Sequence, residues 1–117
     1  MDYRDLLVWQ KSMDLVEKIY RNTQSYPAHE RYGMSAQMRR SAVSIPSNIS
    51  EGQGRRSSDS EFVRFLSISL GSVCELETQI EVSRRLGYVN ADVSAALQSE
   101  LAEVGRMLNG LIRSKSH

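Results

Sequence analysis

The sequence predicts an all-α fold, an antiparallel up-down-up-down four-helix bundle that occupies residues 1–117 as a single domain. Apolar residues recur at alternating spacings of three and four along four long segments, as in helices with one buried face. Short connections separate these segments, and short connections join antiparallel neighbours. No segment alternates with the period of two that a strand requires, and no long unit repeats. The predicted helices span about residues 3–23, 34–52, 59–86 and 91–113.

The first predicted helix carries an unusually broad apolar face. We expect the following residues to form its seam in the bundle: Leu6, Trp9, Met13, Val16 and Tyr20. Leu15 and Ile19 widen this stripe. A helix with such a face is buried on more than one side, which predicts contacts with a second subunit as well as with the bundle. We therefore expect that the protein is not a monomer.

The second predicted helix contains a proline inside its apolar pattern. Pro46 removes a backbone N–H, and its ring clashes with the carbonyl four residues earlier, so the helix should kink or end one turn early. Short polar side chains nearby can bond the freed backbone groups. We interpret the following residues as a structural motif in which none is catalytic: Ser44, Pro46, Asn48, Glu51 and Gly52.

Local signals mark several helix ends. Ser35 is the candidate cap of the second helix, and Ser58 followed by Glu61 reads as a capping box that starts the third helix at Asp59. Gly87 is expected in the left-handed conformation that ends the third helix. These signals divide the chain into the four helices predicted from periodicity.

Small residues interrupt the apolar seam of the third helix. The seam is predicted to contain Phe62, Leu66, Ser69, Val73, Leu76 and Ile80. The middle of this helix carries small residues, Ser69, Gly71 and Ser72, and small residues let a second helix approach closely. We expect the region around Pro46 to be that neighbour.

No set of residues in the sequence is typical of an enzyme. A nucleophile with its base and a metal ligand set are missing, and Gly52 and Gly54 lack the spacing of a phosphate-binding loop. Glu75, Glu77 and Glu81 do not resemble a di-iron site, because such sites in bundles pair glutamate with histidine. We expect no catalysis, no metal, no cofactor and no small-molecule substrate.

Neither a membrane span nor a disulfide is expected. No apolar run approaches the roughly 20 residues that a spanning helix needs, and the N-terminus lacks the order of a secretory signal. Cys74 is the chain's single cysteine, so it cannot form an intrachain disulfide, and we expect it to be buried. These features predict a cytoplasmic protein.

The positive charge is supplied mainly by arginine, although the net charge is only +1. Up to residue 56 the chain has nine Lys/Arg against six Asp/Glu, and beyond it six against eight. The tentative nucleic-acid contacts are Arg39, Arg40, Arg55 and Arg56. Because the arginine fork suits phosphate and carboxylate alike, these residues could instead pair with the glutamates at 75, 77 and 81 of a neighbouring subunit.

Four stretches of the chain resemble a known bacterial family. They are residues 5–11 (DLLVWQK), 27–33 (PAHERYG), 44–52 (SIPSNISEG) and 71–77 (GSVCELE). In this order they are similar to a four-helix bundle family that includes proteins encoded in intervening sequences of 23S ribosomal RNA genes. The same family includes the accessory variability protein of diversity-generating retroelements. The resemblance covers nearly the whole chain.

This resemblance implies a bundle that forms homo-oligomers, with pentameric rings among the relatives. For the retroelement members it also implies a basic surface that binds nucleic acid and reverse transcriptase, from which the near-neutral charge of this chain departs. Two hypotheses follow. The first is a non-enzymatic oligomeric module associated with RNA, and the second is a protein-interaction scaffold that forms a homo-oligomeric ring without binding nucleic acid.

Overall fold

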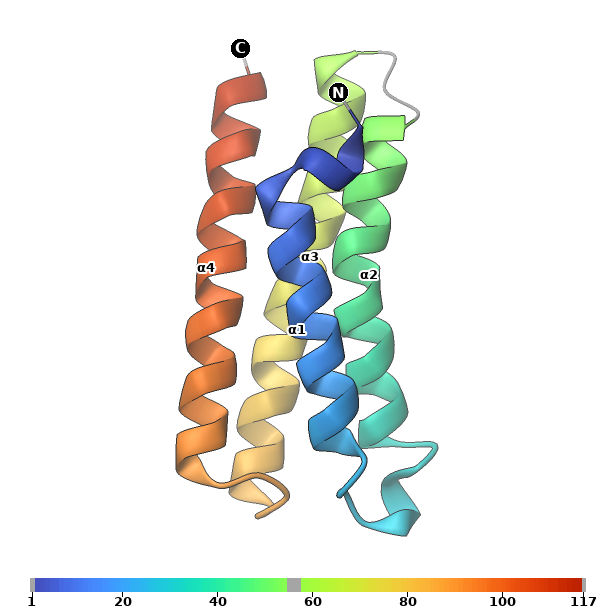
Figure 1. Cartoon of the computed structure of the whole chain (residues 1–117), viewed down its shortest axis with the longest axis vertical. Helices are drawn as coiled ribbons and strands as arrows, with labels where there is room; N and C mark the ends of the chain where they lie inside the picture. Colours follow the sequence, from blue (N-terminus) through green and yellow to red (C-terminus); the bar gives the residue numbers. More distant parts are fainter. Residues whose placement is uncertain (1, 55–57, 117) are drawn as a thin grey trace.

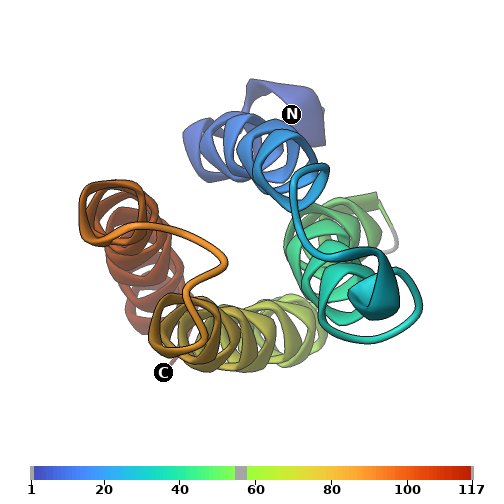
Figure 2. The same cartoon turned by 90° about the horizontal axis from the view of Figure 1, so that it is seen from below.

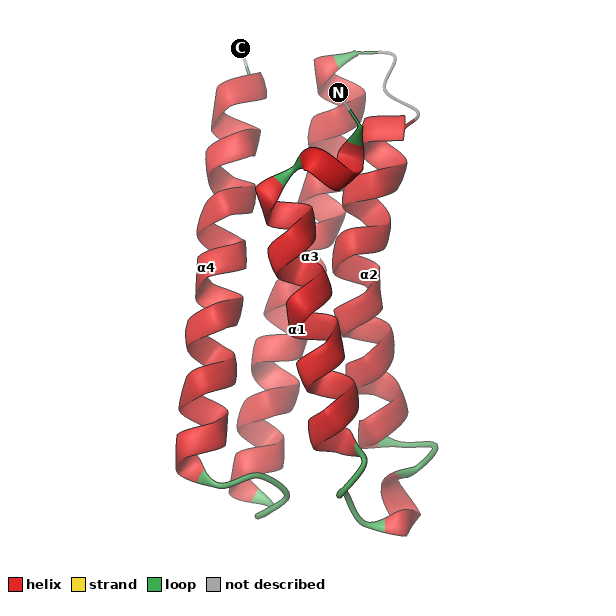
Figure 3. Ribbon diagram, in the orientation of Figure 1, coloured by secondary structure: helices red, strands yellow, loops and turns green. Residues whose placement is uncertain are grey.

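Four long helices, each antiparallel to the next along the chain, make up the protein (Figure 1). The computed structural model describes residues 2–54 and 58–116. Its elements in chain order are η1 (Tyr3–Asp5), α1 (Leu7–Thr23), η2 (Ala28–Glu30), α2 (Met34–Gly54), α3 (Asp59–Arg85) and α4 (Ala91–Lys115). The described ranges contain helices and loops but no strand (Figure 3). The predicted all-α four-helix bundle is confirmed.

The helices follow one another around the bundle axis, so α3 lies diagonally across from α1 (Figure 2). The bundle measures 44 × 23 × 20 Å, and both chain termini lie at the same end (Figure 1). The contact between α2 and α3 is the most extensive, and the contact between α1 and α4 is the smallest of the four. Two exposed ion pairs bridge that smallest contact, Lys11 with Glu103 at 3.2 Å and Lys18 with Glu100.

Each helix contributes one buried stripe to a shared core. From α1 and α2 it contains Val8, Leu15, Ile19, Met38, Ala42, Ile45 and Ile49. From α3 and α4 it contains Phe62, Leu66, Val73, Leu76, Ile80, Leu97, Leu101, Val104 and Leu108. Removal of these apolar side chains from water is the main force that holds the four helices together.

The buried stripe of α1 is not the predicted one. Leu15 and Ile19 are 1% and 0% exposed, whereas Met13 and Tyr20 of the predicted seam are 37% and 41% exposed. The buried stripe also includes Ser12, whose hydroxyl donates to the carbonyl of Trp9 at 2.9 Å. A serine whose hydroxyl is hydrogen-bonded within its own helix can be buried. Because serine is polar, the apolar pattern of the sequence did not identify the stripe that contains Ser12 as the core face.

The first helix also begins later than predicted. Leu6 has extended backbone (φ −72°, ψ 123°), and it separates the short η1 from α1. Asp2 caps η1 by accepting from the backbone N–H of Arg4 at 3.0 Å. The predicted start at residue 3 therefore corresponds to the separate turn of 3-10 helix.

The other helix boundaries follow local chemistry. Ser58 accepts from the backbone N–H of Glu61 at 3.2 Å, and α3 begins at Asp59 as predicted. Gly87 has φ +78°, the left-handed conformation that glycine adopts most readily, and α3 ends just before it. The candidate cap Ser35 does not cap α2, because the carboxylate of Glu30 instead accepts from the N–H of Met34 at 3.0 Å.

Cys74 is exposed on α3, so the prediction that it is buried was wrong. The buried face of α3 passes through Val73 and Leu76, and position 74 lies on the opposite side of the helix.

Gly52 marks the closest approach of α2 to α3. A Cβ atom at Gly52 would lie 2.7 Å from Cβ of Phe65 and 3.1 Å from Cδ1 of Phe62. Since Cβ of Phe65 is fixed to the backbone, it cannot move aside without shifting the helix.

We predict that Gly52→Ala lowers the free energy of unfolding by about 1–3 kcal/mol, the usual effect of overpacking. Gly110→Ala is the matched control, because a Cβ at Gly110 meets no atom within 4 Å. This control should be neutral or stabilising by up to about 1 kcal/mol, since alanine favours a helix more than glycine does. Denaturant titration at one fixed protein concentration compares the two, and equal effects would contradict the close packing.

Candidate functional site

The helix α2 runs through Pro46 to Gly54, in agreement with the predicted span of residues 34–52, so of the two expected effects of the proline, a kink or an early end, the early end does not occur. Two carbonyls that precede the proline receive additional donors. The side-chain amide of Asn48 donates to the carbonyl of Ser44 at 2.9 Å, and the hydroxyl of Ser69 on α3 donates to the carbonyl of Ile45 at 2.9 Å. The carbonyl that loses its N–H donor to Pro46 is that of Ala42, four residues earlier. The two side-chain bonds therefore stabilise the turn around the proline without replacing the missing bond.

Small residues of α3 pack against this part of α2, as predicted. The hydroxyl of Ser72 donates to the hydroxyl of Ser44 at 2.8 Å, and Ser69 is fully buried. Gly71 does not belong to this contact, since it is exposed and a Cβ there would meet nothing within 4 Å. Of the other motif residues, Gly52 is buried against α3 and Glu51 is exposed.

A polar furrow of about 340 Å³ lies between α2 and α3 beside this contact. Its lining residues are Gln37, Arg40, Ser41, Ser44, Ser72, Glu75 and Gln79. Within the described part of the chain, the buried Oε1 of Gln79 lacks a hydrogen-bond partner. No group of His, Cys, Asp and Glu among residues 2–54 and 58–116 is placed to hold a metal ion. The furrow can form hydrogen bonds, but its two central serines are bonded to each other rather than to a base.

An apolar groove lies on the other side of α2, between α2 and α1. We define it by Tyr3, Trp9, Met13, Val16, Tyr20, Val43 and Pro46, which line two adjoining hollows of about 300 and 560 Å³. The two hollows share Val43 and Ser47. Four of the five residues in the predicted α1 seam therefore line a surface groove, and of these Trp9 and Val16 also pack against the core.

The two predicted arginines of α2 have different environments. Arg39 donates through Nε to the hydroxyl of Thr23 at 2.8 Å and through a terminal nitrogen to the carbonyl of Tyr20 at 3.2 Å. Its guanidinium also lies 4.6 Å from the centre of the Tyr20 ring. Arg39 thus donates to a carbonyl at the C-terminal end of α1, where a positive charge is favourable.

Arg40 is exposed and makes no hydrogen bond or ion pair within the described residues. It lines both the polar furrow and the apolar groove, so it stands on the crest of α2 between them. Arg55 and Arg56 lie outside the described residues. Of the two predicted nucleic-acid contacts that the structure describes, Arg39 is held by the end of α1, and Arg40 makes no hydrogen bond or ion pair within the described residues.

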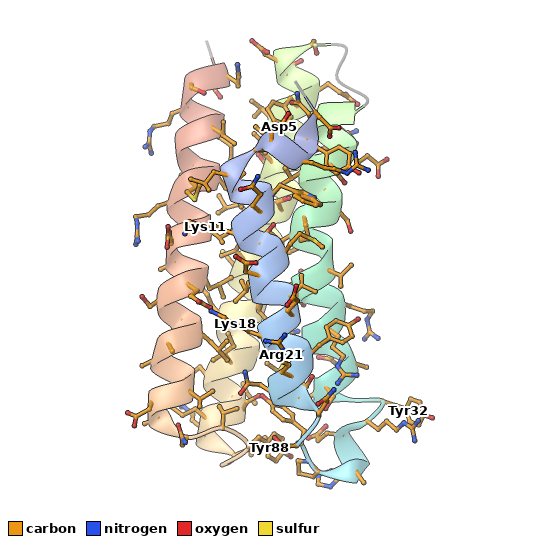
Figure 4. All side chains as sticks on the ribbon, viewed as in Figure 1. Asp5, Lys11, Lys18, Arg21, Tyr32 and Tyr88 are labelled. Carbon is orange, nitrogen blue, oxygen red and sulfur yellow. The ribbon has the colours of Figure 1, made fainter. Side chains whose placement is uncertain are left out.

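Many other exposed cations are already paired with carboxylates. Figure 4 labels Lys11 and Lys18, which face α4 and pair with its glutamates, and Arg21, which pairs with Glu17 at 3.3 Å. On α3, hydrogen bonds from Arg84 and then from Arg85 lower the pKa of Glu81 to about 2. Glu81 therefore has partners within its own helix, although the sequence suggested it as a partner for a neighbouring subunit.

A family model for the 23S rRNA-intervening sequence protein matches residues 4–110, which include the Pro46 motif and all of the groove except Tyr3. The chain belongs to the 23S rRNA-intervening sequence protein family. A solved structure, of a protein of unknown function from the S23 ribosomal protein family of Bacteroides thetaiotaomicron VPI-5482, is similar to it. That structure superposes with a TM-score of 0.82 at 25% identity, over 92% of this chain and 99% of the other. No curated protein matches the chain.

No helix of this 23S rRNA-intervening sequence family member, within residues 2–54 and 58–116, has the length and apolar character needed to cross a bilayer.

The family member also has a polar cluster at one end of the bundle that the sequence analysis missed. The hydroxyl of Tyr88, labelled in Figure 4, donates to Oε2 of Glu30 at 2.8 Å. The N–H of Met34 donates to the other carboxylate oxygen of Glu30. These bonds, that of Met34 first, lower the pKa of Glu30, and Glu30 in turn raises the pKa of Tyr88. The cluster joins the α1–α2 connection to the α3–α4 connection, and no periodic signal marks such a contact between loops.

We predict that Asn48→Ala lowers the free energy of unfolding by about 1–3 kcal/mol. The substitution removes the side-chain amide that donates hydrogen bonds to both the carbonyl and the hydroxyl of Ser44. Ser114→Ala is the control, since this exposed hydroxyl also bonds a helix carbonyl, that of Leu111. The control should change stability by less than about 0.5 kcal/mol. An unchanged thermal melt of Asn48→Ala combined with lost RNA binding would make this corner a binding site.

Proposed function

We propose that this member of the 23S rRNA-intervening sequence protein family is a non-enzymatic scaffold module that assembles into a homo-oligomer through its apolar groove. The groove between α1 and α2 is the observation that supports this function. Met13, Tyr20 and Val43 are 37%, 41% and 38% exposed and lie in one continuous depression with Trp9. A contiguous exposed apolar surface is typical of a protein–protein contact.

The groove is a defined surface because both of its walls are held in place. Pro46 on the α2 side is buried, and Arg39 fixes the end of α1 to α2 next to Tyr20. A preformed surface loses less conformational freedom when it binds than a mobile one does. This arrangement supports association of folded subunits, for which the family resemblance implies five copies.

The absence of catalysis is part of the same proposal. The serines of the polar furrow bond to each other, and the residues described here include no cluster suited to a metal ion. The titratable groups with lowered pKa, Asp2, Glu30 and Glu81, hold two helix caps and an arginine pair in place. These roles are structural.

We predict that sedimentation at micromolar concentration gives a mass larger than one chain, and that Val43→Glu reduces it to one chain. A carboxylate in the groove would be removed from water on association, and pairing with Arg40 of the same helix would not offset that cost. Tyr32→Glu is the matched control, because Tyr32 is 87% exposed at the end of the bundle and lies outside the groove (Figure 4). Trp9, the chain's single tryptophan, provides a second readout, since its emission should shift to shorter wavelength on assembly. A wild-type species of one-chain mass would contradict the proposal.

Association with RNA is a second candidate function, favoured by the unpaired charge of Arg40 and by the name of the family. The lysines and arginines described on α1 and α3 are paired with glutamates, so these two helices offer no free cation to phosphate. An assembly would bring several copies of Arg40 together. Such repetition can supply the phosphate contacts that one near-neutral subunit lacks.

We predict that, if RNA binding occurs, Arg40→Ala weakens a mixed-sequence RNA gel shift at low salt without changing the mass of the oligomer. Each lost phosphate contact should reduce the log–log salt slope by about 0.7 for single strands. Arg55→Ala with Arg56→Ala forms a second arm, expected to abolish the shift. If either change splits the oligomer instead, the arginines serve the protein contact, and the scaffold without RNA is the correct function.

A further inference from the structure

We infer that inorganic phosphate, or the phosphate group of a monoester, binds in a hollow at the start of α2, above Ser35 and between Arg31 and Arg39. The hollow of about 340 Å³ adjoins the connection between α1 and α2, at the end of the bundle opposite both termini (Figure 1). It is formed within one subunit, so its ligand does not depend on the proposed assembly. Its lining residues are Thr23, Gln24, Tyr26, Pro27, Ala28, Arg31, Ser35 and Arg39.

The three central residues follow one another along one side of α2 and of the turn before it. Arg31 has helical backbone (φ −53°, ψ −41°), and Ser35 and Arg39 follow it at intervals of four residues. Residues four apart share one face of a helix, and within α2 this interval is about 6 Å along the axis. The small serine thus leaves a space that two long cationic side chains flank.

Ser35 lies at the bottom of this space. It is 6% exposed and lines the hollow, and its hydroxyl makes no hydrogen bond within the described residues. Buried polar groups usually have a hydrogen-bond partner, because a buried group without one costs free energy. The hydroxyl of Ser35 is therefore a donor available to a ligand that enters the hollow.

Arg39 is held in position by the protein itself. Its Nε donates to the hydroxyl of Thr23 at 2.8 Å, and its Nη2 donates to the carbonyl of Tyr20 at 3.2 Å. A guanidinium has five N–H groups, so those of Nη1 remain available to a ligand. Because the side chain is already fixed, it loses little conformational freedom on binding. Its bond to Tyr20 also covers a carbonyl at the negative end of α1, which would otherwise repel an anion.

Arg31 supplies the second charge. It is exposed, its guanidinium lies 5.7 Å from the centre of the Tyr32 ring, and it makes no hydrogen bond or ion pair within the described residues. An exposed contact between a guanidinium and a ring is weak. Arg31 can therefore close over a ligand at little cost, opposite the fixed Arg39.

No carboxylate opposes these charges among the described residues that line the hollow. Glu30, the residue before Arg31, is directed elsewhere, since its carboxylate accepts from the hydroxyl of Tyr88 at 2.8 Å and from the N–H of Met34 at 3.0 Å. The helix α2 begins at Met34, so the positive end of its dipole lies at the same place. The charges around the hollow therefore favour an anion.

The arrangement of the donors favours a phosphate with three unsubstituted oxygens. Arg31, Ser35 and Arg39 can each bond a different oxygen, and the arginine fork suits phosphate. Inorganic phosphate and phosphate monoesters present three such oxygens. A carboxylate presents two, and a phosphodiester in a nucleic-acid backbone presents two between substituents on both sides. Because Ser35 is buried, a ligand reaches it only with an unsubstituted end.

Isothermal titration calorimetry with inorganic phosphate, at an ionic strength held constant with sodium chloride, tests this site. We expect one phosphate per chain and a melting temperature that rises with phosphate concentration, since a ligand of the folded state stabilises it. Arg31→Gln should weaken binding by about tenfold or more, the effect of a lost hydrogen bond to a charged group. Ser35→Ala should weaken it by about fivefold. It should not lower the melting temperature in phosphate-free buffer, because the hydroxyl has no partner to lose.

Arg113→Gln is the matched control and should leave binding unchanged, because it removes the same charge from an exposed position near the C-terminal end of α4. Glycerol 3-phosphate should also bind, and the tighter of the two phosphates identifies the source of the group. Dimethyl phosphate and acetate should bind more weakly than either. If Arg31→Gln does not fold, Ser35→Ala with Arg113→Gln still decides the outcome.

Three results would overturn the phosphate site. The first is the absence of heat and of a melting shift with both phosphates. The second is equal weakening by Arg31→Gln and Arg113→Gln, which would show an effect of net charge alone. The third is binding of mixed-sequence RNA or dimethyl phosphate that is as tight as that of inorganic phosphate and is weakened by Ser35→Ala, which would assign the hollow to a nucleic-acid backbone.

Discussion

The close contact between α2 and α3 around Pro46 is the constraint on which the rest of the structure depends. A proline in mid-helix leaves the carbonyl four residues earlier, here that of Ala42, without its usual N–H donor, and the turn around Pro46 is stabilised by side-chain hydrogen bonds to neighbouring carbonyls. Asn48 supplies one from within the helix and Ser69 supplies another from α3. Gly52, one and a half turns later, keeps the two helices close enough for these bonds. The register of α2 against α3 is therefore fixed by polar contacts as well as by packing.

This fixed pair gives α2 its two different sides. Towards α3 the helix presents serines, glutamine and Arg40 to the polar furrow, and towards α1 it presents Val43 and Pro46 to the apolar groove. A slip of one residue would rotate both surfaces by about 100° and mix their chemistry. The motif that makes α2 continuous thus also separates the surface that can bind water and ions from the surface that can bind apolar groups.

The sequence was sufficient for the fold class and for most helix boundaries, because periodicity and capping are local signals. Ser58, Asp59 and Gly87 illustrate this, since each acts on backbone groups within one turn. The sequence could not tell which of two apolar stripes on α1 is buried. Both have the helical period, and the buried one contains Ser12, whose hydroxyl is satisfied within the helix. The Glu30–Tyr88 contact was equally hidden, because it joins residues that are distant in sequence. The arginine site was only partly predictable, since adjacent residues of α2 point in different directions and Arg39 is held by α1.

The seam between α1 and α4 has a different character from the rest of the bundle. It is the smallest of the contacts between neighbouring helices, and two exposed lysine–glutamate pairs span it. Exposed pairs of this kind contribute roughly 0–1 kcal/mol each and weaken as ionic strength rises. When the subunit opens locally, α1 and α4 are consequently the helices that part first, and α2 with α3 forms the unit that stays folded longest. Higher salt would thus favour local opening of the contact between α1 and α4 more than it would affect the centre of the bundle.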